Sequence, residues 1–240
     1  MSTFGSSPFA NIPPVVKNLL IINVIFFIAT NIFANGNHSL LVEYLAVYYF
    51  DSPLFRSWQV ISYMFMHGGM AHIFFNMFAL FTFGSTVENS LGSKRFLNFY
   101  LITGLGALAL QMIVQAIELY SAVGQVTLDL NTISSFDLSQ HQIQVIQEIY
   151  RVPMLGASGA IFGLLIAFGM LFPNMELFIM FIPVPIKAKY IIPVYIVVEL
   201  FLGVAQFSGD SVAHFAHLGG ALFGYILIKL WGVNSPRKFL

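Results

Sequence analysis

Residues 156–163 read GASGAIFG, a run of small and apolar residues within a longer hydrophobic segment. Gly159 and Gly163 are four positions apart, so they lie on one face of a helix. Small residues at this spacing let the backbones of two membrane helices approach closely. Ser158 stands directly before the first of these glycines. The segment therefore predicts a tightly packed membrane helix with a hydroxyl group near its interface.

A second stretch, residues 213–224, reads AHFAHLGGALFG and repeats the spacing with Gly220 and Gly224. Two helices with such glycine patterns are expected to pack against each other. That packing would bring the hydroxyl of Ser158 within reach of the imidazole of His217. The two stretches together predict a polar contact between two membrane helices that are distant in sequence.

The composition of the whole chain indicates a membrane protein. Its 240 residues are 58% hydrophobic and only 8% charged, and the mean hydropathy is +0.83. A soluble domain carries about 25% charged residues, so an ordinary soluble globule is excluded. Ten basic residues balance ten acidic ones, which excludes a strongly basic surface for nucleic acid. The absence of cysteine excludes disulfides, thiol catalysis and cysteine-ligated metals.

Six segments are long and apolar enough to cross about 30 Å of hydrocarbon as helices. They are residues 17–34, 66–86, 96–117, 154–173, 190–207 and 212–232, although Pro193 and Glu199 interrupt the fifth. We therefore predict an all-α, polytopic bundle of six transmembrane helices. A membrane domain at 17–232 would follow a short cytoplasmic segment at 1–16 and precede a short cytoplasmic tail at 233–240. We expect the first span to be a retained signal-anchor, because no basic region or cleavage site accompanies it.

Basic residues indicate the orientation, because cytoplasmic segments of membrane proteins are rich in Lys and Arg. Six spans place both termini on one side. If that side is cytoplasmic, its segments carry Lys17, Lys94, Arg95, Lys187, Lys189, Lys229, Arg237 and Lys238. The outer loops then carry only Arg56 and Arg151. We expect both termini in the cytoplasm and, from the compact size, an integral multi-pass protein of a bacterial inner (plasma) membrane.

Two of the outer loops are long and differ in character. Residues 35–65 are rich in Tyr, Leu and Phe, so we expect them to lie partly in the membrane interface. Residues 118–153 are polar, and we expect an external excursion that contains a short amphipathic helix near 139–150.

Polar side chains inside membrane spans are costly and are therefore candidates for function. The notable ones are His67, His72, Asn76, Ser158, His214 and His217. Ser158 and His217 each lie about six residues into their spans, or roughly 9 Å from the outer end. His72 and Asn76 share one helix face in the outer half of the second span. Three helices are thus expected to deliver these groups to a similar depth in one leaflet.

This set of groups is typical of nucleophilic catalysis. A serine becomes a nucleophile when a base lies beside it, and histidine can serve because it titrates near neutral pH. Free backbone N–H groups at a helix N-terminus near Ser158 could stabilise an oxyanion. His72 and Asn76 could supply further hydrogen-bond donors.

Four stretches occur in order on alternating spans: HGGMAHIFFNMFAL from residue 67, VENSLGSKRF from 87, GASGAIFG from 156 and AHFAHLGGALFG from 213. Together they resemble the rhomboid family of intramembrane serine proteases, over residues 54–232. The GxSG element alone is weak because soluble hydrolases share it, whereas four motifs in one order are specific. The resemblance implies the rhomboid-like six-helix bundle.

The resemblance also implies a serine-type endopeptidase with a Ser–His dyad, in which Ser158 is the nucleophile and His217 the general base. The sequence agrees with a dyad, because Asp210 precedes the last span and Glu199 lies in another helix. The substrates implied are single-span membrane proteins within the lipid bilayer, cut near the outer end of their transmembrane helix. No cofactor, metal or nucleic acid is expected.

The resemblance assigns His72, Asn76 and the backbone N–H of Ser158 to oxyanion stabilisation. The residues expected to be supporting or structural are Gly156, Gly159, His67, Glu88, Phe162, His214, Gly220 and Gly224. Two positions depart from the family. Gln59 follows Trp58 where Arg is frequent, and Phe162 stands where Tyr is frequent, so it keeps a stacking surface but lacks a hydroxyl.

Three other functions are alternatives to a protease. A zinc site could use His67, His72 and His217, although the chain has no HExxH motif. A catalytically silent rhomboid-like protein would bind and regulate membrane clients, although such relatives usually lack the serine or the histidine. A transporter is disfavoured, because the chain has no inverted repeat and its polar groups stay in one leaflet.

Overall fold

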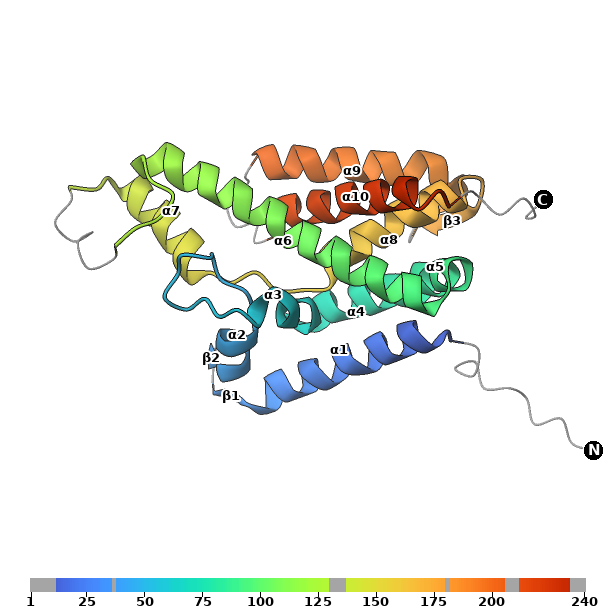
Figure 1. The fold of residues 1–240 in the computed structure, drawn as a ribbon, viewed down its shortest axis with the longest axis horizontal. Coiled ribbons are helices and arrows are strands. Elements are labelled where there is room, and N and C mark those ends of the chain that lie inside the picture. The colour runs from blue at the N-terminus through green and yellow to red at the C-terminus, as the bar shows by residue number, and fades with distance from the viewer. Residues whose placement is uncertain (1–11, 36–37, 130–136, 180–181, 206–211, 234–240) are drawn as a thin grey trace, which may run out of the picture.

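Each of the six predicted spans contains a helix in the computed structural model (Figure 1). The structure describes residues 12–35, 38–129, 137–179, 182–205 and 212–233. Among these, four helical segments are long and apolar enough to cross a membrane: α1 (Pro14–Ile32), Met70–Leu91, α6 (Ser93–Val123) and α9 (Ala188–Ala205). Two shorter apolar helices complete the bundle, α8 (Ser158–Leu171) and α10 (His214–Leu230). The predicted all-α architecture is confirmed, and the fifth span is one continuous helix despite Pro193.

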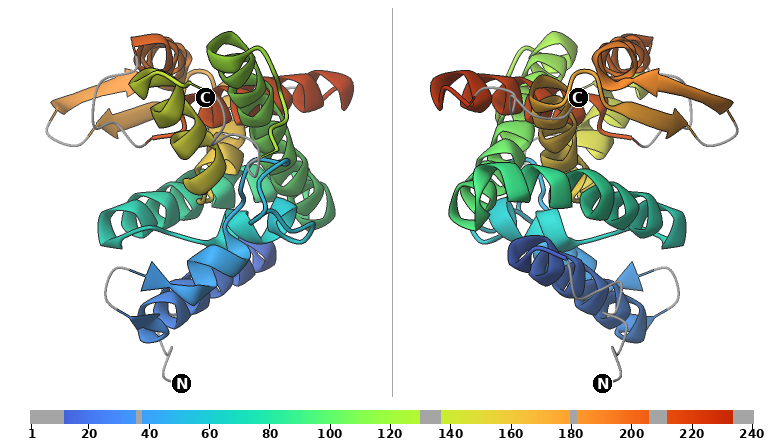
Figure 2. Two further views of the ribbon diagram at one scale, coloured as in Figure 1. Left: turned by 90° about the vertical axis from the view of Figure 1, so that its left-hand side faces the viewer. Right: turned by 90° about the vertical axis from the view of Figure 1, so that its right-hand side faces the viewer.

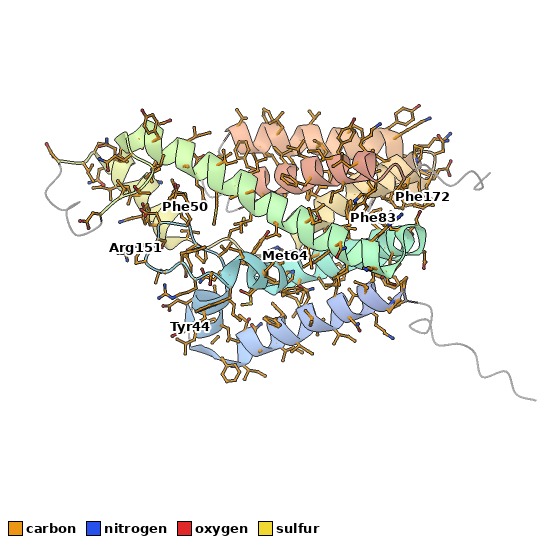
Figure 3. All side chains as sticks on the ribbon, viewed as in Figure 1. Tyr44, Phe50, Met64, Phe83, Arg151 and Phe172 are labelled. Carbon is orange, nitrogen blue, oxygen red and sulfur yellow. The ribbon has the colours of Figure 1, made fainter. Side chains whose placement is uncertain are left out.

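The helices are layered around α8. Figures 1 and 2 show α1 on one side of the bundle and α9 with α10 on the opposite side. The helix α8 is largely enclosed, since ten of its 14 residues are buried, and α10 packs against both α8 and α6. Met64 lies near the middle of the bundle in Figure 3 and is itself buried. Many apolar side chains on α1, α4 and α9 face outward instead, as a lipid environment requires.

Glycines let α8 and α10 touch through their backbones. A Cβ atom added to Gly220 would collide with the carbonyl group of Gly159. One added to Gly224 would lie 2.8 Å from the Cα atom of Gly163. The close approach expected from the two glycine patterns is therefore present.

The second span begins later than its hydropathy predicts. The helical run consists of α4 (Met70–Ala79), a π-helical turn η2 (Leu80–Gly84) and α5 (Ser85–Leu91). His67 consequently precedes the helix, whereas we expected it inside the span. Residues 66–69 read MHGG, and hydropathy averaged over a whole span does not report where helical hydrogen bonding starts.

The fourth span also begins later than predicted, which changes the position of Ser158. Met154 pairs with Val47 in an isolated β-bridge, and the N–H of Gly156 donates to the carbonyl of Tyr63 at 2.9 Å. These bonds hold the chain out of the helix until residue 158. Ser158 is therefore the first residue of α8 and does not lie several residues inside a helix, as we expected.

The polar outer loop forms the amphipathic helix that the sequence predicts. It is α7 (Gln140–Arg151), whose Ser139 and Gln142 form a capping box. The helix α6 continues to Val123, beyond the expected end at 117, and α7 packs against this extension. A small second core joins the two helices and the first loop through Tyr49, Leu119, Ile146, Ile149 and Tyr150.

The apolar outer loop lies at the same end of the bundle as α7 (Figure 1). It contains β1 (Ala34–Asn35), β2 (His38–Ser39), α2 (Leu40–Leu45), α3 (Gln59–Ser62) and a 3₁₀ turn η1 (Tyr63–Phe65). Gln59 is fully buried here, and its amide donates to the carbonyls of Glu43 and Leu54, both at 3.2 Å. The side-chain oxygen Oε1 of Gln59 accepts a hydrogen bond from the backbone N–H of Arg56 at 2.9 Å. Gln59 thus ties the loop together without the charge that the family frequently has.

The opposite end holds α5 and a hairpin of β3 (Glu176–Ile179) and β4 (Ile182–Lys187) (Figure 1). The buried carboxylate of Glu88 joins three helices there. It accepts the N–H groups of Val15 at 3.1 Å and Val16 at 2.8 Å, and the hydroxyl of Ser93 at 2.6 Å. Negative charge at the N-terminus of α1 also matches the helix dipole. The bracing role expected for Glu88 has this physical basis.

Candidate active site

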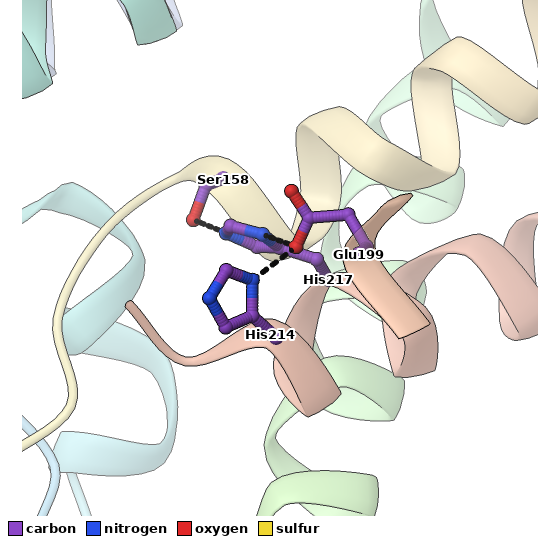
Figure 4. A network of polar contacts seen from close by, with 4 residues as sticks. All are labelled: Ser158, Glu199, His214 and His217. Carbon is purple, nitrogen blue, oxygen red and sulfur yellow. Dashed lines mark hydrogen bonds and ion pairs between the residues drawn. The ribbon is translucent and has the colours of Figure 1, made fainter. Parts of the chain in front are cut away.

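Ser158 and His217 form a hydrogen bond between α8 and α10. The distance between Ser158 Oγ and His217 Nε2 is 2.8 Å, and Figure 4 shows the two side chains pointing toward each other. Ser158 is the first residue of α8 and His217 the fourth of α10, so both lie at helix N-termini. Both side chains are half-buried. The backbone contacts of Gly220 with Gly159 and of Gly224 with Gly163 hold α8 and α10 at this distance.

Phe162 holds the imidazole from one side. Its ring stacks on that of His217 with centroids 4.2 Å apart and planes inclined by 6°. Phe162 lies one turn after Ser158 on α8 and is buried. The stacking surface expected at this departure from the family is therefore present, and it restricts the rotation of the His217 ring.

Glu199 is the site residue that sequence reasoning missed. Its Oε2 atom lies 2.9 Å from Nδ1 of His217 and 2.7 Å from Nδ1 of His214 (Figure 4). The expectation that no acid stands beside His217 is wrong. That expectation discounted Glu199 because it lies on a different helix from His217. Catalytic groups that act together commonly come from different secondary-structure elements. The rule that an ionisable residue inside a membrane span marks function would have found it.

His72 lies beside the start of α8, and Asn76 follows it one turn later on α4. A Cβ atom added to Gly156 would lie 2.8 Å from His72 Nε2 and 3.5 Å from Ser158 Oγ, so the bare glycine leaves space between these two groups. Gly156 has φ of +133°, a conformation that favours glycine. Asn76 is buried, and its Nδ2 donor has no hydrogen-bond partner among the described residues.

The remaining expected residues have structural surroundings. His67 is buried, and its ring meets that of His72 edge-on with centroids 5.0 Å apart. His214 is buried beside Glu199. Gly159, Gly220 and Gly224 serve the contact between α8 and α10. Glu88 lies at the far end of the bundle and takes no part in the site.

The histidines expected as an alternative zinc set are not the ones that cluster. Instead, one ligand atom each of Glu199, His214 and His217 lies within 4.8 Å of the others. Such a set is a possible metal site. However, both Nδ1 atoms already lie at hydrogen-bonding distance from one carboxylate oxygen, and His217 Nε2 contacts Ser158.

The hydrogen-bond pattern fits an activated hydroxyl. If the Nδ1–H of His217 donates to Glu199, its Nε2 carries a lone pair that accepts the Ser158 O–H. That arrangement can remove the hydroxyl proton during nucleophilic attack.

Comparison with known proteins shows the family of this chain. A family model described as Rhomboid domain matches residues 55–233. RHOMBOID-like protein 4 of Arabidopsis thaliana is 30% identical over 172 residues, which are 72% of this chain and 33% of that protein. Rhomboid protease GluP of Bacillus subtilis is 28% identical over 183 residues, 76% of this chain and 27% of that protein.

Rhomboid protease AarA of Providencia stuartii is 26% identical over 234 residues, 92% of this chain and 73% of that protein. The chain therefore spans most of AarA but only about a third or less of RHOMBOID-like protein 4 and GluP. The family model matches well over half of this chain. This protein accordingly belongs to the rhomboid family.

Proposed function

We propose that this rhomboid protein is an intramembrane serine endopeptidase. The observation that carries the proposal is the 2.8 Å contact between Ser158 Oγ and His217 Nε2 inside a bundle of membrane-spanning helices. Two of the relatives are named rhomboid proteases, which supports the same chemistry.

In the first step His217 Nε2 takes the proton of Ser158 as the oxygen attacks the scissile carbonyl carbon. The carbonyl oxygen becomes an oxyanion, and the free N–H at the start of α8 with the side chains of His72 and Asn76 stabilises it. His217 then gives its proton to the leaving amine. Water, activated by the same imidazole, attacks the acyl-enzyme and releases Ser158. None of these steps requires a cofactor.

The proposed substrates are single-span membrane proteins cut near the outer end of their helix. The ends of α1, α6, α9 and α10 that bear Lys17, Lys94, Lys189 and Lys229 lie together at one end of the bundle (Figure 1). Ser158 and His217 stand at the N-termini of their helices, toward the opposite end. With the basic end in the cytoplasm, the site opens to the outer side, as proposed for a bacterial inner membrane.

Purified protein with a fluorophosphonate probe and a model single-span substrate tests the proposal. We expect labelling and cleavage in the wild type, loss of both in Ser158→Ala, and loss of cleavage in His217→Ala. Cleavage that survives in Ser158→Ala would contradict the serine mechanism, and cleavage abolished by a chelator would favour a metal. Substrate binding with no cleavage by the wild type would instead identify a silent regulator of membrane clients.

A further inference from the structure

We infer that Glu199 is a positioning residue for His217, so that Ser158, His217 and Glu199 act as a triad built across three membrane helices. This inference rests on the proposed protease function. It departs from the dyad that the sequence implies, because it gives the buried carboxylate on α9 a part in orienting and charging the base.

The first support is where α9 places its carboxylate. The buried positions of α9 form one narrow stripe: Ala188, Ile192, Glu199 and Gly203. The outward positions are highly exposed and apolar, among them Val194, Val197, Phe201 and Val204. Glu199 is only 4% exposed, so its charge points into the bundle although nearly every other face of α9 would suit lipid. An ionised group so placed requires compensating partners.

The second support is a close approach of α9 to α10 beside these groups. Gly203 lies one turn after Glu199, and a Cβ atom added there would come within 3.2 Å of the Cβ atom of His214. The bare glycine lets α9 lie near the first turn of α10. In this arrangement the carboxylate of Glu199 reaches both His214 and His217.

The third support is the tautomer that the contacts select. A carboxylate oxygen can only accept, so His217 Nδ1 at 2.9 Å must carry the proton. The neutral ring then has its lone pair on Nε2, which faces Ser158 Oγ at 2.8 Å. This is the tautomer that a general base needs. Without Glu199, either ring nitrogen could hold the proton, and only the tautomer with the proton on Nδ1 could accept the proton of Ser158.

The fourth support is the charge balance during the reaction. When Ser158 attacks, its proton moves to Nε2 and His217 becomes an imidazolium ion while Nδ1–H still donates to Glu199. The carboxylate stays ionised, so the new positive charge forms 2.9 Å from a negative oxygen in a poorly solvated place. The proton later leaves with the amine, and Glu199 returns to its starting state. Glu199 thus favours the charge-separated state without itself exchanging a proton.

His214 steadies the carboxylate from the other side. Its Nδ1 lies 2.7 Å from the same Oε2 atom, and its ring stands nearly perpendicular to that of His217 at 89°. Two donors on one oxygen leave the carboxylate little freedom to turn away from the base. We therefore expect His214 to act through Glu199 and to have the smaller effect on rate.

The test compares Glu199→Gln, Glu199→Asp and His214→Gln with the wild type in proteoliposomes that contain the model substrate. We expect Glu199→Gln to lower kcat by about 10²- to 10⁴-fold with little change in KM, because substrate binding does not involve the acid. The rate of fluorophosphonate labelling should fall in parallel. Glu199→Asp, which keeps the charge on a shorter side chain, should recover part of kcat, and His214→Gln should lose less than Glu199→Gln.

Glu88→Gln is the matched control. It removes the charge of another buried carboxylate, at the opposite end of the bundle, and should lower thermal stability while kcat of the folded protein stays near the wild-type value. If Glu199→Gln also lowers stability, kcat of Glu199→Asp relative to the wild type still distinguishes a positioning role of Glu199 from a structural one. A merely structural Glu199 would give unchanged kcat in every folded variant, and that result would overturn the inference.

The outcomes also separate this inference from the proposed function. A wild type that neither labels nor cleaves would refute the protease itself. A wild type that cleaves, with Ser158→Ala inactive and Glu199→Gln fully active, would leave the protease standing and remove only the triad. Cleavage abolished by a chelator and restored by zinc would make Glu199 a metal ligand and would likewise overturn the inference.

Discussion

The ring of Phe162 lies parallel to the imidazole of His217, 4.2 Å away and inclined by only 6°. An imidazole held in this way keeps Nε2 aimed at Ser158 and Nδ1 aimed at Glu199, both under 3 Å away. The contact with Phe162 restricts the imidazole of His217 to one orientation. Its removal should therefore lower the rate, and because Phe162 is buried it should lower the stability of the protein as well.

Phe162→Ala should lower kcat by about 10- to 100-fold, since misplacement of a catalytic group by about 1 Å can cost 10²-fold. Phe162→Tyr keeps the flat surface and should stay close to wild type. Phe162→Leu keeps most of the volume without an aromatic face and should fall between them. Steady-state cleavage of the model substrate measures the series. Equal rates for the Leu and Tyr variants would contradict a role for stacking.

Gly220→Ala should damage both stability and activity. The added methyl group would collide with the carbonyl of Gly159 and push α10 away from α8. Overpacking of this kind costs about 1–3 kcal/mol, and the separation would lengthen the contact between Ser158 and His217. Thermal unfolding and probe labelling measure the two effects.

Gly69→Ala is the control for this substitution. Gly69 has extended backbone, with φ of 177°, and a Cβ atom there meets nothing within 4 Å. This variant should match the wild type in both measurements. A Gly220→Ala protein that behaves like Gly69→Ala would show that the backbone contact is dispensable.

Glu88→Gln should destabilise the protein without altering the chemistry of the folded fraction. The carboxylate accepts two backbone N–H groups of α1 and the hydroxyl of Ser93. Hydrogen bonds to a charged group contribute about 1.5–3 kcal/mol each, and the amide retains only part of this. Thermal unfolding in detergent should show a lower midpoint. Unchanged stability would indicate that water can accept the hydrogen bonds of the α1 N–H groups and of Ser93 in place of the Glu88 carboxylate.

His72→Ala and Asn76→Ala should each lower kcat by about 10²- to 10³-fold, the usual effect of losing one oxyanion donor. The unpartnered Nδ2 of Asn76 and the space at Gly156 between His72 and Ser158 are where a developing negative charge would be received. Fluorophosphonate labelling, which also passes through a charged oxygen, should slow in parallel. An Asn76→Ala variant with wild-type labelling and cleavage would remove Asn76 from this role.

The bundle and the approach of two of its helices were predictable because both depend on local composition. Apolar length gives the spans, and the four-residue glycine spacing in GASGAIFG and LGGALFG gives the close contact between α8 and α10. Helix starts were not predictable in the same way. The turn that makes Ser158 a helix-first residue depends on bonds from Val47 and Tyr63, which are about 100 residues away in sequence.

Glu199 shows the other limit of the sequence. Its distance of 18 residues from His217 indicates nothing about contact, because α9 and α10 run past each other and meet only through tertiary packing. The buried face that Glu199 shares with Ile192 and Gly203 is not distinguishable in the sequence, because the neighbouring positions of α9 are equally apolar. Which helix this face contacts depends on how the layers of the bundle are arranged.

The network of Ser158, Glu199, His214 and His217 comes entirely from the last three helices of the bundle. A ribosome that adds about 5–20 residues each second must therefore synthesise α10 before the base exists. Until α10 has inserted and docked against α8, the hydroxyl of Ser158 lacks the imidazole of His217. The proposed nucleophile thus stays without its base until the last of these three helices has docked, so the proposed activity cannot act on neighbouring membrane chains before then.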